Sequence, residues 1–297
     1  MSDRLKGKVA VVTGGGGGIG RGIVLALASE GAQLVVNDLG KRSMPGNPRA
    51  ADLVVEEVIK SGAKAVANDD DVSVMAGGQS IIKTAIDHFG RIDILVCCAA
   101  NYKISMIDET SEEEWDKTIN IHIKGHFSCI KAAVPYMKAQ KSGCIIPFSS
   151  RGAFGYGSSA AYSVAKAGIM GLTSSLAMEL GKHGIRVNCI SPSATTPLFP
   201  KPKIAYGGIP APKPADPEMV APMVVYLCTD DARNISGEFF YAGGTDIGLY
   251  PREGIPLQLI RKASDKWTID ELIEIVPATF GVYLAKAKVE VDPIGNR

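Results

Sequence analysis

The residues best suited to chemistry in this chain are Tyr162 and Lys166, which stand four positions apart. Positions i and i+4 share one face of a helix, so the Lys166 ammonium is expected near the Tyr162 phenol. A free tyrosine has a pKa of about 10, and a nearby cation lowers that pKa toward the range where acid–base catalysis is efficient. About half a match to this spacing is expected by chance among nine tyrosines, so the pair gains its weight from the rest of the sequence.

A glycine-rich loop lies near the N-terminus, between an expected strand at residues 9–12 and an expected helix from residue 21. A strand, a glycine loop and a helix in this order are typical of dinucleotide-binding sites. Glycines let backbone N–H groups approach a pyrophosphate, and the helix N-terminus adds positive potential. The sequence therefore predicts a cofactor loop at Gly14, Gly18, Ile19 and Gly20, with a flexible glycine tract as the alternative.

An acidic residue follows at the place where such sites bind ribose. The second expected strand, residues 33–38, ends at Asp38, about 20 residues after the loop. A carboxylate there accepts hydrogen bonds from the ribose diol and repels a 2′-phosphate, which predicts NAD rather than NADP. The alternative is an aspartate that caps a helix or a turn, because Leu39 and Gly40 follow.

These motifs together resemble the short-chain dehydrogenase/reductase family over about residues 5–250. The resemblance implies a Rossmann-like α/β fold, a doubly wound parallel sheet in three α/β/α layers, with a Ser–Tyr–Lys catalytic set and a fourth polar residue. Segments 35–40, 65–68, 89–93, 226–228 and 243–248 are similar to one branch, the (3R)-hydroxyacyl-CoA dehydrogenase units of peroxisomal multifunctional enzymes of type 2. That branch implies NAD-dependent oxidation of a hydroxyacyl-CoA thioester.

The resemblance gives Tyr162 the role of taking the hydroxyl proton, while Lys166 lowers its pKa and holds the nicotinamide ribose. The serine is Ser149 or Ser150: the spacing to Tyr162 favours the first, and the register of the expected strand favours the second. We prefer Ser150, because the loop at residues 152–157 can absorb a deletion.

His122 stands where the wider family has asparagine. A neutral imidazole both accepts and donates, so His122 is expected to link Lys166 to water. A hydrogen-bonded buried histidine with no proton traffic is the alternative. The full set of expected cofactor-binding residues is Gly14, Gly18, Ile19, Gly20, Asp38, Leu39, Asp71, Val72, Cys98, Ala99, Tyr162, Lys166 and Thr195.

A departure from the family occurs at Cys97-Cys98-Ala99-Ala100, where Asn-Asn-Ala-Gly is usual. A cysteine cannot reproduce the donors and acceptor of an amide, and Ala100 adds a methyl group where glycine allows close approach. This departure motivates an alternative function, a non-catalytic subunit paired with an active homologue. Oxidation of a steroid or ring alcohol is a further alternative to a hydroxyacyl-CoA.

The composition of the chain limits the classes of fold and of binding partner that it can have. The chain has 297 residues, 46% hydrophobic, and a net charge of +1, which suits one α/β domain and gives no pull toward nucleic acid or membranes. The six cysteines contain no Cys-x-x-Cys, so no metal is expected. The N-terminus has no apolar signal region and residues 294–297 form no peroxisomal signal, so a cytoplasmic location is expected.

Two segments lie outside the core pattern. Residues 198–217 are proline-rich and are expected to form the substrate lid, where Lys201, Lys203 and Lys213 are candidates for binding CoA phosphates. Residues 251–297 form an extension in which Thr268 and Glu271 make a capping box, and we expect it to pack on the core or on a partner subunit. By resemblance, helices near residues 112–140 and 162–182 imply a homodimer or homotetramer.

Overall fold

The computed structural model describes residues 3–40, 49–155, 159–196, 198 and 215–251, together with positions 275, 278 and 279. The chain divides into two compact units, Met1–Pro251 and Arg252–Arg297. All elements named below belong to the first unit. Most of the expected lid, with its three lysines, and the capping box at Thr268 and Glu271 lie outside the described residues.

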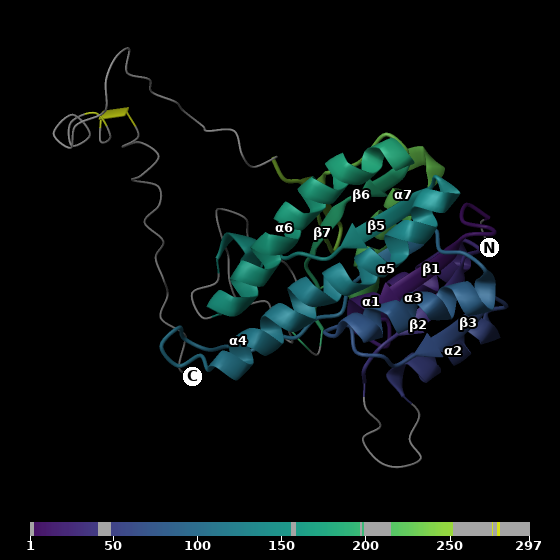
Figure 1. Ribbon diagram of the computed structural model, residues 1–297, viewed down its shortest axis with the longest axis horizontal. Coiled ribbons are helices and arrows are strands. Elements are labelled where there is room, and N and C mark those ends of the chain that lie inside the picture. The colour runs from purple at the N-terminus through teal and green to yellow at the C-terminus, as the bar shows by residue number, and fades with distance from the viewer. Residues whose placement is uncertain are drawn as a thin grey trace. The chain divides into compact units, whose positions relative to one another are not determined.

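A six-stranded parallel sheet forms the centre of the first unit as described (Figure 1). Its strands are β1 (Val9–Thr13), β2 (Gln33–Asn37), β3 (Ala65–Asn68), β4 (Ile94–Cys97), β5 (Gly143–Pro147) and β6 (Ile185–Val187). The strand order is β3-β2-β1-β4-β5-β6, so the direction of winding reverses between β1 and β4. In such sheets ligands bind beyond the carboxyl ends of the strands at this reversal.

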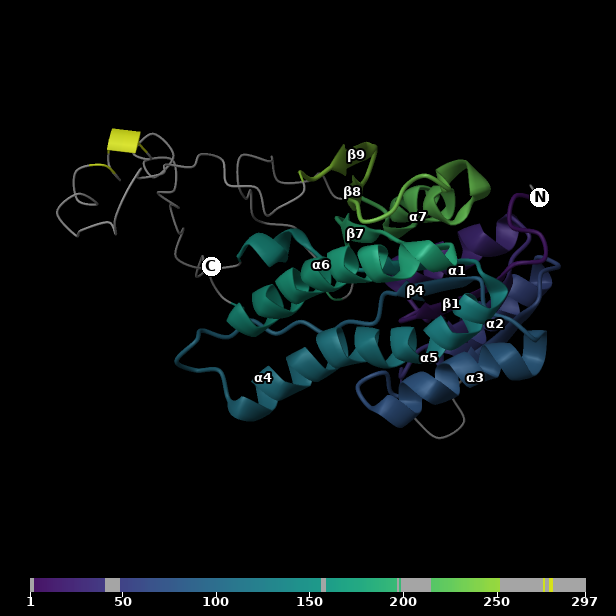
Figure 2. The same ribbon diagram turned by 45° about the horizontal axis from the view of Figure 1, so that its top comes forward.

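Helices cover both faces of this sheet (Figure 1, Figure 2). The α-helices are α1 (Gly18–Ser29), α2 (Ala50–Lys60), α3 (Met75–Phe89), α4 (Glu112–Ile119), α5 (Gly125–Gln140), α6 (Ala160–Leu180) and α7 (Ala221–Cys228). Successive side chains of a strand point to opposite faces. Ala10 and Val12 of β1 therefore pack with α1, α2 and α7, whereas Val9 and Val11 pack with α3, α5 and α6. The expected three-layer, doubly wound fold is confirmed.

A smaller sheet of three strands extends the carboxyl edge of the structure. It contains β7 (Cys189–Pro192), β8 (Phe239–Gly243) and β9 (Asp246–Leu249). β7 follows β6 after one residue, Asn188, and a bridge between Phe148 and Ile190 ties it to the chain just beyond β5. Short helical turns complete the described elements: η2 (Arg151–Phe154), η3 (Gly181–His183), η4 (Pro217–Val220) and η5 (Asp230–Ala232).

The long helix expected at residues 112–140 is interrupted. α4 begins after Ser111, whose hydroxyl accepts from the Glu114 backbone N–H at 3.2 Å. A π-helical turn, η1 (Asn120–Lys124), then separates α4 from α5. Wide turns of this kind are frequent at functional sites, and this one carries His122. Within the described ranges, no helix has the length and apolar character needed to cross a bilayer.

Candidate active site

The glycine loop leaves β1 at the carboxyl edge of the sheet and folds too tightly for larger residues. Gly14 has φ +68°, and a Cβ there would lie 2.8 Å from Cα of Ala99. A Cβ on Gly20 would lie 2.0 Å from the carbonyl oxygen of Gly14. A Cβ on Gly17 would meet nothing within 4 Å. The loop is therefore a cradle that opens at Gly17 in front of α1, and its shape fits a pyrophosphate.

Asp38 closes one side of this cradle at the end of β2. Its carboxylate accepts from the Gly16 backbone N–H at 3.0 Å and from the Gly40 backbone N–H at 2.8 Å. Each carboxylate oxygen has a further lone pair, so the group can still accept from a ribose diol. Leu39 is exposed beside it.

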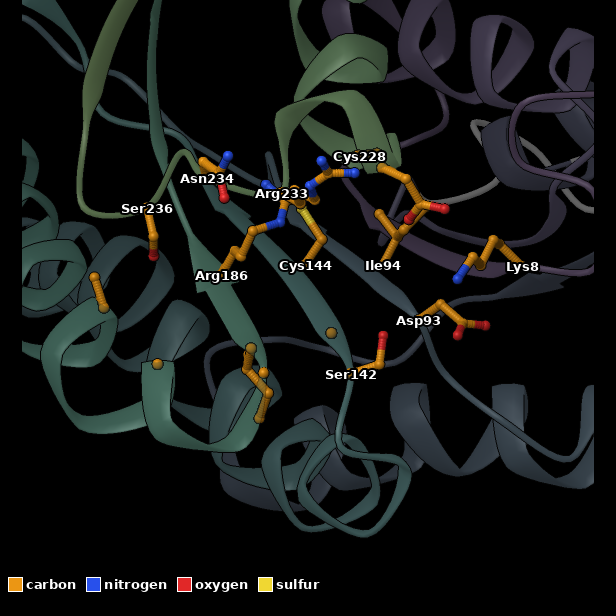
Figure 3. A pocket seen from close by; sticks show the side chains of 16 residues that line it. Lys8, Asp93, Ile94, Ser142, Cys144, Arg186, Cys228, Arg233, Asn234 and Ser236 are labelled. Atoms are coloured by element: carbon orange, nitrogen blue, oxygen red, sulfur yellow. The ribbon is translucent and has the colours of Figure 1, made fainter.

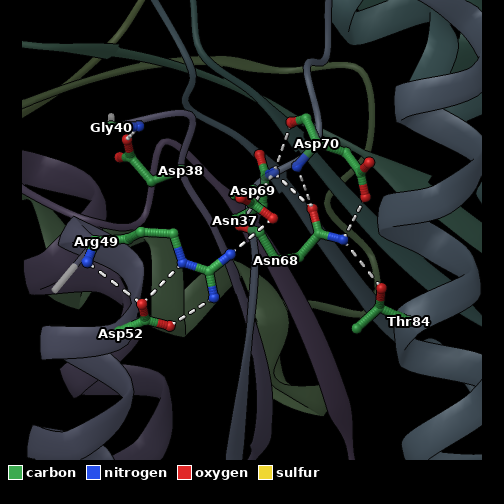
Figure 4. A network of polar contacts seen from close by, with 9 residues as sticks. All are labelled: Asn37, Asp38, Gly40, Arg49, Asp52, Asn68, Asp69, Asp70 and Thr84. Carbon is green, nitrogen blue, oxygen red and sulfur yellow. Dashed lines mark hydrogen bonds and ion pairs between the residues drawn. The ribbon is translucent and has the colours of Figure 1, made fainter. Parts of the chain in front are cut away.

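A polar network fixes the neighbouring strand ends (Figure 4). Asn37 donates to Oδ1 of Asn68 at 2.9 Å, and Asn68 donates to Asp70 at 2.7 Å and to Thr84 at 3.1 Å. These bonds hold β2 and β3 in register where Asp38 begins. The expected adenine-side residues follow: the Asp71 carboxylate accepts from the Ser73 backbone N–H at 2.8 Å, and the Val72 side chain is buried.

Tyr162 and Lys166 lie together on α6, and both side chains are almost fully buried. The Lys166 Nζ lies 5.5 Å from the centroid of the Tyr162 ring and donates to the Phe148 carbonyl oxygen at 2.7 Å. Burial lowers the pKa of Lys166 to about 8, against opposing electrostatic effects of Cys98 and Cys189. The expected Tyr–Lys face therefore exists, and its ammonium is held by a backbone carbonyl.

His122 packs edge-on against the Tyr162 ring, with centroids 5.3 Å apart and planes at 89°. Its Nε2 lies 2.9 Å from the Asn101 carbonyl oxygen. Burial, and next the charge of Lys166, lower the pKa of His122 well below its usual value, so the ring is neutral at physiological pH. Its Nδ1 is buried and has no partner among the described residues, which leaves a position for water.

The two candidate serines differ in their contacts. The Ser149 hydroxyl donates to the Lys166 carbonyl oxygen at 2.8 Å, which joins the end of β5 to α6. The Ser150 hydroxyl accepts from the Gly152 backbone N–H at 3.0 Å. A hydroxyl that accepts in this way keeps its proton for donation to a substrate oxygen. Ser150 thus caps the η2 turn, and its choice as the catalytic serine stays a prediction.

Hydrogen bonds of the backbone tie the Cys97–Ala100 segment to its neighbours. The Cys98 backbone N–H donates to the Thr13 carbonyl oxygen at 3.2 Å, and the Cys97 carbonyl oxygen accepts from Phe148 at 3.1 Å. The Ala99 backbone N–H donates to the Thr13 hydroxyl at 3.3 Å. Ala100 is exposed, so its added methyl group crowds nothing in the core. The close approach that we expected at Ala100 occurs instead between Gly14 and Ala99.

Thr195 requires a correction. Its backbone was expected to face the nicotinamide carboxamide, but its N–H donates to the Ala215 carbonyl oxygen at 2.9 Å. The side-chain hydroxyl, in contrast, is buried without a partner in the described part of the chain. The polar group that Thr195 offers a ligand is therefore this hydroxyl. Gly18, with φ +49°, lies against Thr196, and Ile19 is half-buried at the start of α1.

Sequence analysis missed two residues around this site. His126 is fully buried one helical turn after His122, and its Nε2 accepts from the Phe148 backbone N–H at 3.3 Å. Burial lowers the pKa of His126 to about 3, so it is neutral beside Lys166. Its spacing from His122 was a visible signal. The other is Arg151, a charged residue directly after the two serines.

A cavity lies away from the catalytic candidates Tyr162, Lys166 and Ser150. It has a volume of about 440 Å³ and opens at the amino edge of the sheet, where Lys8, Asp93, Ser142 and Arg186 line it (Figure 3). Tyr162 and Ser150 stand beyond the opposite edge. The catalytic candidates are therefore assigned by their chemistry and mutual contacts rather than by the size of a cavity. No group of three or more His, Cys, Asp or Glu in the described ranges could hold a metal ion.

Residues 8–202 match the family model described as short chain dehydrogenase. The chain belongs to the short-chain dehydrogenase family. Members of this family are oxidoreductases that use a nicotinamide cofactor, NAD or NADP.

Relatives within the family are similar over most of this chain. The peroxisomal multifunctional enzyme type 2 of Drosophila melanogaster is 37% identical over 277 residues, which are 92% of this chain and 45% of that enzyme. The chain thus spans less than half of that relative. The (2S)-[(R)-hydroxy(phenyl)methyl]succinyl-CoA dehydrogenase subunit of Thauera aromatica is 33% identical over 81% of this chain and 96% of that subunit.

A solved short-chain dehydrogenase from Mycobacterium avium has the same fold. It superposes with a TM-score of 0.81 at 37% identity and covers 93% of this chain and 96% of its own. The likeness in fold therefore extends beyond the segment that matches the family model.

Proposed function

We propose that this protein is an NAD-dependent dehydrogenase that oxidises the secondary hydroxyl group of a (3R)-3-hydroxyacyl-CoA thioester to a ketone. The observation that carries the proposal is the buried contact of Tyr162 with Lys166 and His122. One relative supports the substrate class by its name, because it is a dehydrogenase of a hydroxylated acyl-CoA.

Each residue of the site has a definite task in this reaction. Tyr162 accepts the proton of the substrate hydroxyl group, and Ser150 donates a hydrogen bond to the same oxygen. Lys166 keeps positive charge next to the phenol because the Phe148 carbonyl oxygen holds its Nζ at 2.7 Å. His122 stays neutral and positions the Tyr162 ring from the side. The nicotinamide ring, when bound, supplies the hydride acceptor.

The preference for NAD rests on Asp38. Its carboxylate stands at the ribose end of the glycine cradle, held by the backbone N–H groups of Gly16 and Gly40. A negative charge fixed at this place repels a 2′-phosphate and accepts from a 2′-hydroxyl. The glycine loop would hold the pyrophosphate, and the Thr195 hydroxyl would bind the carboxamide.

The non-catalytic alternative loses its main support. It was motivated by Cys97, Cys98 and Ala100, yet backbone bonds hold β4 in place and Ala100 is exposed. The experiment is a spectrophotometric assay of NADH formation from (3R)- and (3S)-3-hydroxybutyryl-CoA, and from a ring alcohol, with NAD and with NADP. Turnover of the (3R) thioester with NAD supports the proposal. Turnover of the ring alcohol alone, or of nothing despite NAD binding, contradicts it.

A further inference from the structure

Arg151 stands directly after Ser150 and opens the η2 turn, which packs against α6. Consecutive Cα atoms are about 3.8 Å apart, so the backbone of Arg151 lies beside that of Ser150, the proposed catalytic serine. Its Cζ lies 6.0 Å from the centroid of the Tyr241 ring on β8. The Arg151 side chain therefore extends from the segment after Ser150 to β8 of the smaller sheet, on the carboxyl side of the structure.

No acid neutralises this cation in the described part of the chain. Other arginines in these described residues do form ion pairs, such as Arg21 with Glu57 and Arg91 with Asp93, but none of the ion pairs there involves Arg151. Among the described residues, no hydrogen bond begins at its guanidinium, and the Nη1 atom is buried without a partner. The aromatic face of Tyr241 supports the cation but accepts no directed hydrogen bond from it.

A buried guanidinium nitrogen without an acceptor is costly, because it has lost water and gained nothing in exchange. Arg151 as a whole is half-buried, and a guanidinium with one buried nitrogen is satisfied best by an anion. An anionic ligand with planar, paired oxygens matches the guanidinium geometry best. An unpaired arginine next to a catalytic serine therefore indicates that the missing anion arrives with the substrate.

We propose that Arg151 binds a free carboxylate on the acyl part of the substrate, so that the preferred substrate is a hydroxyacyl thioester with a second, unesterified carboxyl group. This inference rests on the proposed function of the site. The phosphates of CoA are the other source of anionic oxygens. The long pantetheine arm separates them from the thioester, whereas Arg151 adjoins the serine that would contact the reacting oxygen. The short separation between Arg151 and Ser150 along the chain favours a carboxylate on the acyl group over a phosphate of CoA.

The experiment compares acyl groups that differ in this carboxylate. Wild type, Arg151→Met and Arg151→Lys are assayed with the 3-hydroxyglutaryl and 3-hydroxyhexanoyl thioesters of CoA, and with the same acyl groups on N-acetylcysteamine, which lacks phosphates. Arg151→Met is expected to lower kcat/KM for both 3-hydroxyglutaryl thioesters by about 10- to 150-fold, the range for a hydrogen bond to a charged group. Both 3-hydroxyhexanoyl thioesters should change less than about twofold.

Two further variants separate binding from structure. Arg151→Lys keeps the charge but not the paired donors, so its kcat/KM for the glutaryl substrates should fall between wild type and Arg151→Met. Arg233→Met makes the same chemical change at an exposed arginine near the amino-edge cavity, and it should leave the preference intact. A purely structural role of Arg151 would lower Tm and all four activities together, which would overturn the inference.

A loss confined to the two CoA thioesters would assign Arg151 to a CoA phosphate and overturn the carboxylate. Calorimetry with glutaryl-CoA and hexanoyl-CoA, whose acyl chains carry no hydroxyl group to oxidise, on the NAD-saturated enzyme gives the comparison without turnover. If wild type oxidises nothing but binds glutaryl-CoA more tightly through Arg151, the proposed reaction fails and the carboxylate site stands. If binding shows no preference, the carboxylate site fails whatever the activity.

Discussion

The hydroxyl of Ser149 donates a 2.8 Å hydrogen bond to the backbone carbonyl oxygen of Lys166. This bond uses the single proton of that hydroxyl and joins the end of β5 to the helix that carries the Tyr–Lys pair. Ser150, one residue later, accepts from Gly152 instead and keeps its proton. The adjacent serines therefore differ in their contacts: Ser149 anchors α6, and Ser150 is the one that we propose as the donor to the substrate oxygen.

Ser150→Ala should lower kcat by about 100-fold or more, because it removes a donor to the reacting oxygen. Ser149→Ala should leave kcat within about tenfold but reduce the free energy of unfolding by about 1 kcal/mol, the usual worth of a buried hydrogen bond. Steady-state kinetics and urea unfolding of the two variants separate these effects. The opposite pattern, with kcat lost only in Ser149→Ala, would exchange the two roles.

Asp38→Ser should change the cofactor preference. Without the carboxylate, the 2′-phosphate of NADP is no longer repelled and the ribose diol of NAD loses an acceptor. The ratio of the NADP to the NAD dissociation constant should fall at least about tenfold, which is about 1.4 kcal/mol. Calorimetric titration measures both constants. Asp69→Ser is the control, since it removes a nearby carboxylate that pairs with Arg49 rather than with the glycine loop. An unchanged ratio in Asp38→Ser would refute its role in selectivity.

The glycine loop offers a matched pair of alanine substitutions. Gly20→Ala places a Cβ 2.0 Å from the Gly14 carbonyl oxygen, so the loop must shift and Tm should drop by several degrees. Gly17 has φ −168°, and its Cβ would meet nothing within 4 Å, so Gly17→Ala should keep Tm. It should still weaken cofactor binding, because the new methyl group occupies the open side of the cradle. Thermal unfolding and cofactor titration of both variants check this; unweakened binding in Gly17→Ala would put the pyrophosphate elsewhere.

The features that could be predicted from the sequence are those that depend on local patterns of residues. The strand–glycine–helix order at Gly14–Gly20 and the one-face spacing of Tyr162 and Lys166 depend on residues close together in the chain, and the structure has both. Expected strands that alternate with expected helices along the chain likewise indicated a parallel sheet.

The features that sequence could not give depend on contacts between distant segments. The Thr195 amide is taken by Ala215 across the residues of the expected lid, and nothing in the local sequence shows this bond. That Arg151 has no acidic partner among the described residues is also invisible in sequence, because it depends on which side chains lie around it in space. The π-helical turn at His122 lies within a segment, residues 112–140, that the sequence predicted as one continuous helix.

Lys166 should leave a signature in the pH dependence of stability. Burial lowers its pKa from 10.5 to about 8 in the folded protein. Between these values the unfolded chain binds more protons than the folded one, so the free energy of unfolding rises with pH there. At pH values below both pKa values, Lys166 is charged in the folded and in the unfolded protein. The folded protein then bears the full free-energy cost of burying the ammonium.

Lys166→Met removes this contribution. The wild-type free energy of unfolding, minus that of Lys166→Met, should therefore increase by about 2 to 3 kcal/mol from about pH 7 to about pH 10. Urea unfolding at a series of pH values measures the difference. Lys138→Met, at a more exposed lysine, serves as the control and should show a much smaller change. A flat difference for Lys166→Met would mean that the ammonium is not held in a buried position.

The most direct test of the proposed function follows the hydride and the proton separately. (3R)-3-Hydroxybutyryl-CoA that carries deuterium on C3 is incubated with NAD and either wild type or Tyr162→Phe, and the NADH is analysed by mass spectrometry. Wild type should produce deuterated NADH, and Tyr162→Phe should form it about 100- to 10,000-fold more slowly while still binding NAD. Undeuterated NADH, or equal rates in the two proteins, would contradict oxidation at C3 with Tyr162 as the base.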